Sequence, residues 1–137
     1  MTQEEVKEEF KQTDGDPHVK ARQRAIRVQR SRQRMMASVP TATVVIMNPT
    51  HYAVALSYEE GEAVAPTCVA KGLDSLALRI RAVAEEAGVP VAEDPPLARA
   101  LCAAVEIDEE IPLAQYEAVA RVIGLVPANR RRFSFAR

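Results

Sequence analysis

Apolar residues gather into two short runs on either side of residue 50. Residues 41–47 (TATVVIM) and 52–58 (YAVALSY) are rich in β-branched and apolar side chains, which is typical of buried strands. The acidic YEEGE segment then turns the chain toward a third apolar run around residues 67–70. The pattern therefore predicts three successive strands, with a break at residues 48–50.

Beyond Gly72 the apolar positions recur at helical spacing, which predicts a helix that ends at Gly88. A short strand at 89–92 and two more helices follow, the first capped by Asp94 and the second opening at Pro112. The first helix is expected to bury one face, formed by Leu73, Leu76, Ile80, Val83, Ala84 and Ala87. Expected core residues of the other two are Leu97, Leu101, Leu113 and Tyr116. This order predicts an α/β fold, with a small central sheet of about four strands surrounded by helices.

Residues 1–40 have a different character, because charged residues dominate and large apolar side chains are few. Residues 1–16 carry six acids and two bases, whereas residues 17–37 carry seven bases and no acid. A segment of this composition buries too little apolar surface to offset the conformational entropy that it would lose on folding into a packed core. Two helical pieces, 3–13 and 17–37, are predicted around the break at Gly15-Asp16-Pro17. We therefore expect a long, charged helical linker over 1–40 and a globular domain over 41–127.

Composition excludes several classes of function. The 137 residues hold 18 bases and 19 acids, two cysteines and two histidines, so neither a disulfide framework nor a metal site is expected. No cofactor motif is present, and no apolar run approaches the ~20 residues of a membrane span. The basic stretch 17–37 raises nucleic-acid binding as an alternative. It lacks interleaved aromatic residues for base stacking, so a solvated linker is preferred and no nucleic-acid partner is expected.

The residues that carry chemistry are Asn48, Pro49, Thr50 and His51, in the break between the first two strands. An Asn-Pro pair is often only a turn, and that interpretation stays open here. Pro49 has no N–H, so the usual attack of the next backbone nitrogen on the asparagine side chain is closed. The remaining intramolecular route is attack by the Asn48 amide nitrogen on its own main-chain carbonyl. That reaction closes a succinimide ring and cuts the backbone before Pro49.

Two neighbours could assist this cleavage. His51 is a candidate base that moves a proton from the attacking amide to the departing Pro49 nitrogen, or else a merely structural histidine. Thr50 could orient the turn through its hydroxyl group. Lys71 could face the loop, whereas Asp74 is assigned to the solvent side of its helix. Cys68 and Cys102 are expected to pack as small hydrophobic residues.

Three segments in fixed order, with the upstream stretch VKEEFKQTDGDPHVKARQRAIRVQRSRQRMMASVP before them, resemble a known family over roughly residues 4–126. They are VIMNPTHYAVALSY, CVAKGLDSLALRIRAVAEEAGVPVAEDPPLARAL and VEIDEEIPLAQYEAVARVI. The chain resembles the cytoplasmic domain of the FlhB/YscU family of type III export switch proteins. DPPLARAL and EIDEEIP look more like the flagellar branch than the injectisome branch. Residues 128–137 lie outside the resemblance and are expected to be a disordered tail.

The resemblance implies self-cleavage between Asn48 and Pro49, with the two pieces remaining associated. It implies a switch of flagellar export from rod and hook subunits to filament subunits, with no external substrate turned over. The implied partners are other export-apparatus proteins, the hook-length control protein and the exported subunits. The implied location is the cytoplasmic face of the bacterial inner membrane, reached through an absent N-terminal membrane domain. The alternatives are the equivalent injectisome switch protein and a non-cleaving binding module for secreted proteins.

Overall fold

The computed structural model describes residues 16–49, 51–59 and 65–126. The predicted helix 3–13, Thr50 and the tail 128–137 lie outside these residues. The chain forms two compact units, Met1–Arg34 and Met35–Arg137. The second unit starts at Met35, whereas the sequence placed the start of the globular part near Pro40.

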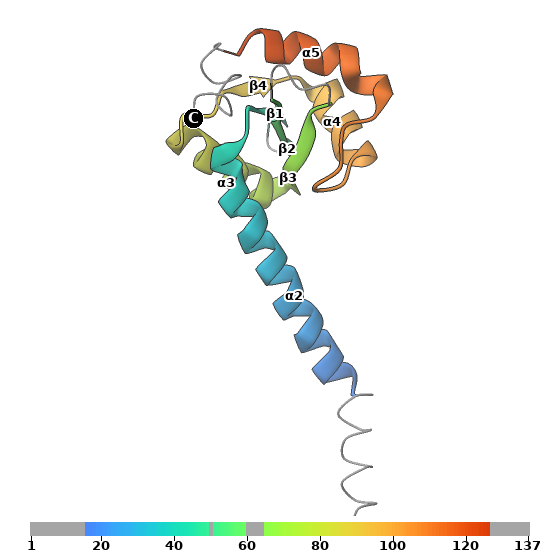
Figure 1. The fold of residues 1–137 in the computed structure, drawn as a ribbon. Coiled ribbons are helices and arrows are strands. Elements are labelled where there is room, and N and C mark those ends of the chain that lie inside the picture. The colour runs from blue at the N-terminus through green and yellow to red at the C-terminus, as the bar shows by residue number, and fades with distance from the viewer. Residues whose placement is uncertain (1–15, 50, 60–64, 127–137) are drawn as a thin grey trace, which may run out of the picture. The chain divides into compact units, whose positions relative to one another are not determined.

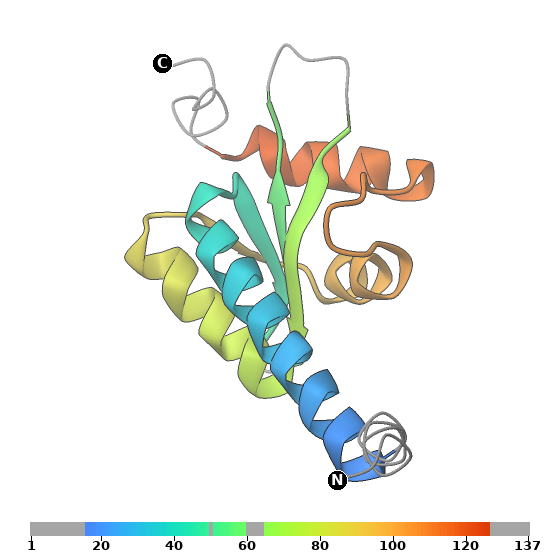
Figure 2. The same ribbon diagram turned by 60° about the horizontal axis from the view of Figure 1, so that its bottom comes forward.

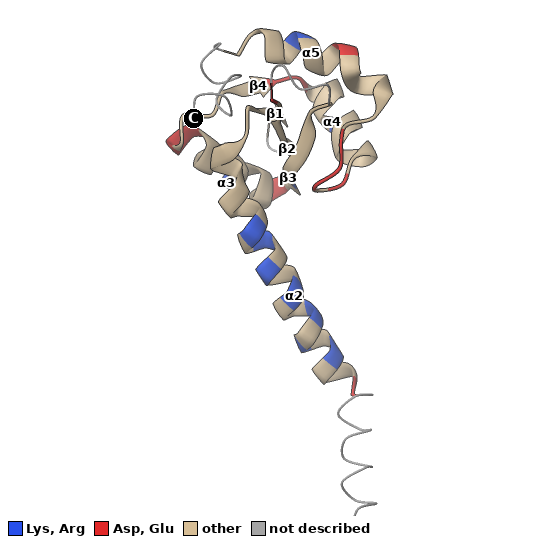
Figure 3. Ribbon diagram, viewed as in Figure 1, with Lys and Arg blue, Asp and Glu red and all other residues tan. Residues whose placement is uncertain are grey.

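Helix α2 (Pro17–Ser38) confirms the helix predicted over 17–37. All seven of its lysine and arginine residues are exposed, and Figure 3 shows them along the helix. Met35 is its one buried residue, and it packs in the second unit beside Val39 in the short 3-10 helix η1 (Val39–Thr41). The charged part of the helix therefore contributes nothing to a core, as its composition indicates.

The second unit is built on a four-stranded mixed sheet (Figure 1). Its strands are β1 (Val44–Asn48), β2 (Tyr52–Ser57), β3 (Thr67–Leu73) and β4 (Val91–Glu93), in the order β3-β2-β1-β4. β2 runs antiparallel to both β1 and β3, whereas β4 is parallel to β1. The predicted α/β sheet is confirmed, and β1 is an interior strand held on both edges.

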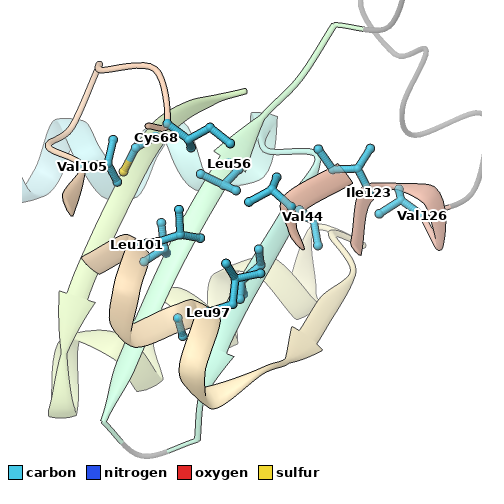
Figure 4. Close-up of a cluster of buried hydrophobic side chains, with 13 residues drawn as sticks. Val44, Leu56, Cys68, Leu97, Leu101, Val105, Ile123 and Val126 are labelled. Carbon is cyan, nitrogen blue, oxygen red and sulfur yellow. The ribbon is translucent and has the colours of Figure 1, made fainter. Parts of the chain in front are cut away.

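Helices cover both faces of this sheet (Figure 2). They are α3 (Asp74–Glu86), α4 (Pro95–Ala104) and α5 (Tyr116–Gly124), the last preceded by the 3-10 turn η2 (Leu113–Gln115). Successive side chains of a strand point to opposite faces. Val44 and Ile46 accordingly join the cluster beneath α4 and α5 (Figure 4), while Val45 and Met47 join the one beneath α3.

Four predicted core positions are wrong. Ala87 is exposed because α3 ends at Glu86, so Ala87 lies at the C-cap and not on the buried face of the helix. Leu113 and Tyr116 are 78% and 41% exposed, because Pro112 opens a 3-10 turn and α5 begins only at Tyr116. That turn changes the angular phase, so the stripe continues on Val119 and Ile123, both of which are buried. Leu73 is 52% exposed because it ends β3 and does not belong to the helix. Leu97 and Leu101 are buried as expected.

Candidate functional site

The candidate site is the tight turn that joins β1 to β2. Asn48 is the last residue of β1 and pairs with Tyr52, the first residue of β2. The backbone N–H of His51 donates a hydrogen bond to the main-chain oxygen of Asn48 at 3.0 Å. Pro49 occupies the second position of this four-residue turn, where its fixed φ is favourable. The structure thus brings Asn48, Pro49 and His51 together, whereas Thr50 lies outside the described residues.

The hydrogen bond from His51 bears directly on the peptide bond between Asn48 and Pro49. Its acceptor is the carbonyl oxygen of that bond, so the donor withdraws electron density from the carbonyl carbon. When a nucleophile adds to this carbon, negative charge develops on the same oxygen. A backbone N–H already aimed at the oxygen stabilises that charge without reorganising. The same hydrogen bond that closes the turn therefore also supplies one donor of an oxyanion hole.

The side chain of Asn48 lies in a half-buried position at the end of the strand. Its amide group makes no hydrogen bond to any of the described residues. Among the described residues, no acceptor binds the amide nitrogen, so nothing in that part of the chain opposes its approach to its own main-chain carbonyl. Because nucleophile and electrophile belong to one residue, their encounter costs no translational entropy.

The end of β1 is fixed from the side of β4 as well. The Asp94 N–H donates to the Met47 carbonyl oxygen at 2.9 Å, one residue before the turn. Asp94 is also the N-cap of α4, and its Oδ1 accepts a hydrogen bond from the Leu97 N–H at 3.2 Å. The cap predicted from the sequence is confirmed. Neighbours on both edges of β1 hold the Asn48 backbone in place.

The His51 side chain projects from the turn and is 64% exposed. Its Nδ1 lies 3.8 Å from Oδ1 of Asp74, and its ring lies 6.5 Å from the Tyr52 ring, centre to centre. The Asp74 N–H also donates to the His51 carbonyl oxygen at 3.0 Å. The sequence places Asp74 on the solvent side of its helix, which its 79% exposure confirms, but gives no sign of its contact with His51. The pairing of Tyr52 with Leu73 across β2 and β3 places residues 51 and 74 side by side.

Lys71 does not face the turn, which corrects the expectation from the sequence. Its ammonium group donates to the carbonyl oxygen of Cys102 at 3.0 Å and lies 3.3 Å from the Glu106 carboxylate. Lys71 therefore neutralises the C-terminal end of α4, where cations are favourable. It ties β3 to that helix and takes no direct part in the site.

The two cysteines pack as the sequence predicts. Cys68 is fully buried, and burial raises the pKa of its thiol from 9.0 to about 11. Burial also raises the pKa of the partly buried Cys102 thiol. Within the described residues, no three His, Cys, Asp or Glu side chains are grouped so that they could hold a metal ion. The helices of that same part of the chain are too short or too polar to cross a membrane.

Comparison with known proteins gives consistent matches. A model of the FlhB HrpN YscU SpaS family matches residues 1–126. The flagellar biosynthetic protein FlhB of Escherichia coli (strain K12) is 51% identical over 126 residues, which cover 92% of this chain and 33% of that protein. The chain thus spans about a third of the length of the curated relatives it matches.

Solved structures of cytoplasmic and C-terminal domains have the same fold. The cytoplasmic domain of FlhB from Shewanella putrefaciens matches with a TM-score of 0.67 and 41% identity, covering 75% of this chain and 79% of that one. A mutated EscU C-terminal domain, in which one asparagine is replaced by alanine, matches with a TM-score of 0.64 and 34% identity. That match covers 68% of this chain and 93% of the EscU chain.

Proposed function

The chain belongs to the FlhB HrpN YscU SpaS family, and from this premise we propose that it cuts its own backbone between Asn48 and Pro49. The observation that carries the proposal is the turn itself. An asparagine whose side-chain amide makes no hydrogen bond within the described residues precedes a proline, and its main-chain carbonyl oxygen accepts a hydrogen bond from the His51 N–H. Nucleophile, leaving group and oxyanion donor lie within four consecutive residues.

The proposed reaction begins with attack by Nδ2 of Asn48 on the main-chain carbonyl carbon of the same residue. A C–N bond forms within a five-membered succinimide ring, and the peptide bond to the Pro49 nitrogen breaks. One proton leaves the attacking amide and one is taken up by the departing nitrogen, so the step balances without a co-reactant. His51 is the proposed carrier of this proton, and Thr50 is proposed to orient the turn. One water molecule later opens the imide.

The two fragments are expected to stay together after the cut. The fragment 1–48 contributes β1, whose residues Val44, Val45, Ile46 and Met47 are at most 1% exposed. These side chains pack on both faces of the sheet against residues of the fragment 49–137. Burial of apolar surface stabilises the domain by about 25 cal/mol per Å². The cut breaks one covalent bond but exposes none of this buried surface, so the core is expected to hold the fragments together. The change is confined to the turn, whose surface gains two chain ends.

We propose that this irreversible change serves as a switch in the bacterial flagellar type III export apparatus. In this role the domain directs export from rod and hook subunits to filament subunits after the turn has been cut. The proposed partners are other export-apparatus proteins, the hook-length control protein and the exported subunits. The proposed location is the cytoplasmic face of the inner membrane, with residues 1–40 as the linker to a membrane domain. The chain turns over no external substrate in this proposal.

A flagellar role is favoured over the injectisome role. FlhB relatives from Escherichia coli and Salmonella typhimurium are 51% and 48% identical to the chain. Among the solved structures, the FlhB cytoplasmic domain matches with a TM-score of 0.67, against 0.64 for an EscU domain and 0.53 for the PscU domain. The EscU likeness keeps the injectisome switch as the second candidate. A non-cleaving binding module is the remaining alternative, in which the turn has no chemical role.

A denaturing gel of purified protein tests self-cleavage. The wild type is expected to run as two fragments, 1–48 and 49–137, whereas Asn48→Ala, which removes the nucleophile, is expected to run as one intact chain. Asp94→Asn is a suitable control at the same end of the sheet, because asparagine keeps an oxygen that can cap α4. A wild-type chain that is folded and stays intact during incubation at neutral pH contradicts the proposal and favours the binding module.

A further inference from the structure

We propose that Asp74 is a positioning residue for this self-cleavage, which holds the His51 imidazole in the orientation that lets it carry the proton. The inference rests on the proposed cleavage at Asn48 and extends it to a residue on a different element. Asp74 opens α3, whereas the turn joins β1 to β2.

Asp74 contacts His51 through both its main chain and its side chain. Its N–H donates to the His51 carbonyl oxygen at 3.0 Å, and its Oδ1 lies 3.8 Å from Nδ1 of the imidazole. The backbone hydrogen bond fixes the position of the His51 main chain. The carboxylate contact orients the imidazole so that Nδ1 faces Asp74. Two contacts from one residue to the same histidine restrain both the position and the rotation of its side chain.

The backbone of Asp74 is held in an uncommon conformation that makes these contacts possible. Its φ is +50°, in the left-handed region, and only Asp108 shares this among the non-glycine residues of the described ranges. L-amino acids adopt this region at a cost in free energy, and aspartate tolerates it better than most. Backbone strain of this kind is concentrated at functional sites. At Asp74 it turns the N–H and the carboxylate toward His51 together.

A carboxylate beside Nδ1 favours the imidazole tautomer that carries its proton on Nδ1. The lone pair is then on Nε2, which is the nitrogen left to take the proton from the Asn48 amide and return it to the Pro49 nitrogen. The 3.8 Å separation exceeds a hydrogen bond, and such contacts tighten when the histidine becomes charged during the reaction. Both side chains are largely exposed, at 64% and 79%, and solvent screens such a pair, so the expected effect is only about threefold to fivefold in rate.

The first test measures the rate of cleavage in chains made by cell-free translation and labelled in a short pulse. We expect Asp74→Asn to slow the appearance of the fragments about threefold to fivefold, because it keeps the size of the side chain and removes its charge. Asp74→Gly permits the positive φ without strain and is expected to slow cleavage similarly while leaving thermal stability undiminished. Asp108→Asn is the matched control, since Asp108 also has a positive φ and donates its N–H to a strand carbonyl, that of Cys68.

The second test reads the tautomer of His51 directly, which a merely structural role of Asp74 would leave unchanged. In the uncleavable Asn48→Ala chain, the ¹⁵N shifts of the imidazole at about pH 8 are expected to report the proton on Nδ1. Adding Asp74→Asn is expected to move the population toward the proton on Nε2. The signals of His18, which lies on α2, should stay unchanged.

The outcomes separate the two proposals. A wild-type chain that cleaves, with Asp74→Asn cleaving at the same rate or with an unaltered His51 tautomer, overturns the role of Asp74 and leaves self-cleavage standing. A wild-type chain that does not cleave overturns the proposed function itself. Slower cleavage in Asp74→Asn but not in Asp108→Asn, together with the tautomer shift, supports the inference.

Discussion

Replacing Ile46 by alanine should loosen the link between the two fragments more than it disturbs any other property. Ile46 is fully buried at the middle of β1, where it pairs with Val54 on β2 and Ala92 on β4. Its side chain lies in the cluster that contains Leu97 and Leu101 of α4. Every one of these neighbours belongs to the fragment 49–137, so the contacts of Ile46 cross the cut.

The size of the effect follows from the packing around Ile46. Truncation of a buried isoleucine to alanine typically costs about 2–5 kcal/mol, with larger values where the surroundings cannot close the cavity. β1 is held by strands on both edges and by helices on both faces, so little collapse is possible and about 4 kcal/mol is expected. Since 1.4 kcal/mol corresponds to a factor of ten, the two fragments should bind about a thousandfold more weakly.

Sedimentation of the split chain, produced as separate fragments 1–48 and 49–137 and then mixed, measures this directly. The wild-type pair should sediment as one complex over a wide range of dilution, and the Ile46→Ala pair should dissociate at much higher concentration. Ile26→Ala is the matched control, because Ile26 lies on α2 in the same fragment and is 42% exposed. Equal dissociation constants for the wild-type and Ile46→Ala pairs would refute the view that β1 holds the cut domain together.

Three further predictions concern the stability of the domain. Asp94→Ala removes the N-cap of α4 and should lower the free energy of unfolding by about 1 kcal/mol, measured by urea denaturation. An unchanged unfolding midpoint would show that the cap does not stabilise the domain. Gly72→Ala places a Cβ 2.7 Å from Cγ of Leu76 and should lower the free energy of unfolding by about 1–3 kcal/mol. Gly124→Ala, whose Cβ meets no atom within 4 Å, should lower it less. Equal losses in the two variants would contradict the steric crowding at Gly72. Burial raises the pKa of Cys68 from 9.0 to about 11, which favours the protonated thiol in the folded state. The contribution of the protonated Cys68 thiol to the free energy of unfolding is complete below pH 9.0 and falls by about 3 kcal/mol as the pH rises to about 11. Unfolding measured across this range should show this loss in the wild type and not in Cys68→Ala.

Much of the fold was predictable because the signals were local. The β-branched run before residue 48 indicates a strand whatever follows it, and Asp94 before two prolines indicates a helix start from adjacent residues alone. Leu113 and Tyr116 were misplaced because residues 113–115 form a 3-10 turn, so positions spaced for a continuous α-helix do not share one face there. The strand order with β4 beside β1 also depends on packing between distant segments, which periodicity does not encode.

The candidate site divides in the same way. Asn48, Pro49 and His51 are neighbours in sequence, so the chemistry of asparagine and proline was enough to single them out. Asp74 lies 23 positions beyond His51 and reaches it only through the register of β2 against β3. An aspartate in the first turn of an amphipathic helix is usually explained by its favourable interaction with the helix dipole, so Asp74 gave no local sign of a role in the site. The pairing of Tyr52 with Leu73, which no local pattern predicts, brings it to His51.

The intact mass of the purified, folded chain tests the central claim most directly. Scission by asparagine cyclisation predicts two species, residues 1–48 and 49–137, whose masses add up to the uncut chain if the imide persists. After the imide opens, the masses add up to the uncut chain plus one water. Asn48→Ala should give one mass only. A single species of full mass from folded wild-type protein, even after long incubation, would contradict the claim that this asparagine cuts its own backbone.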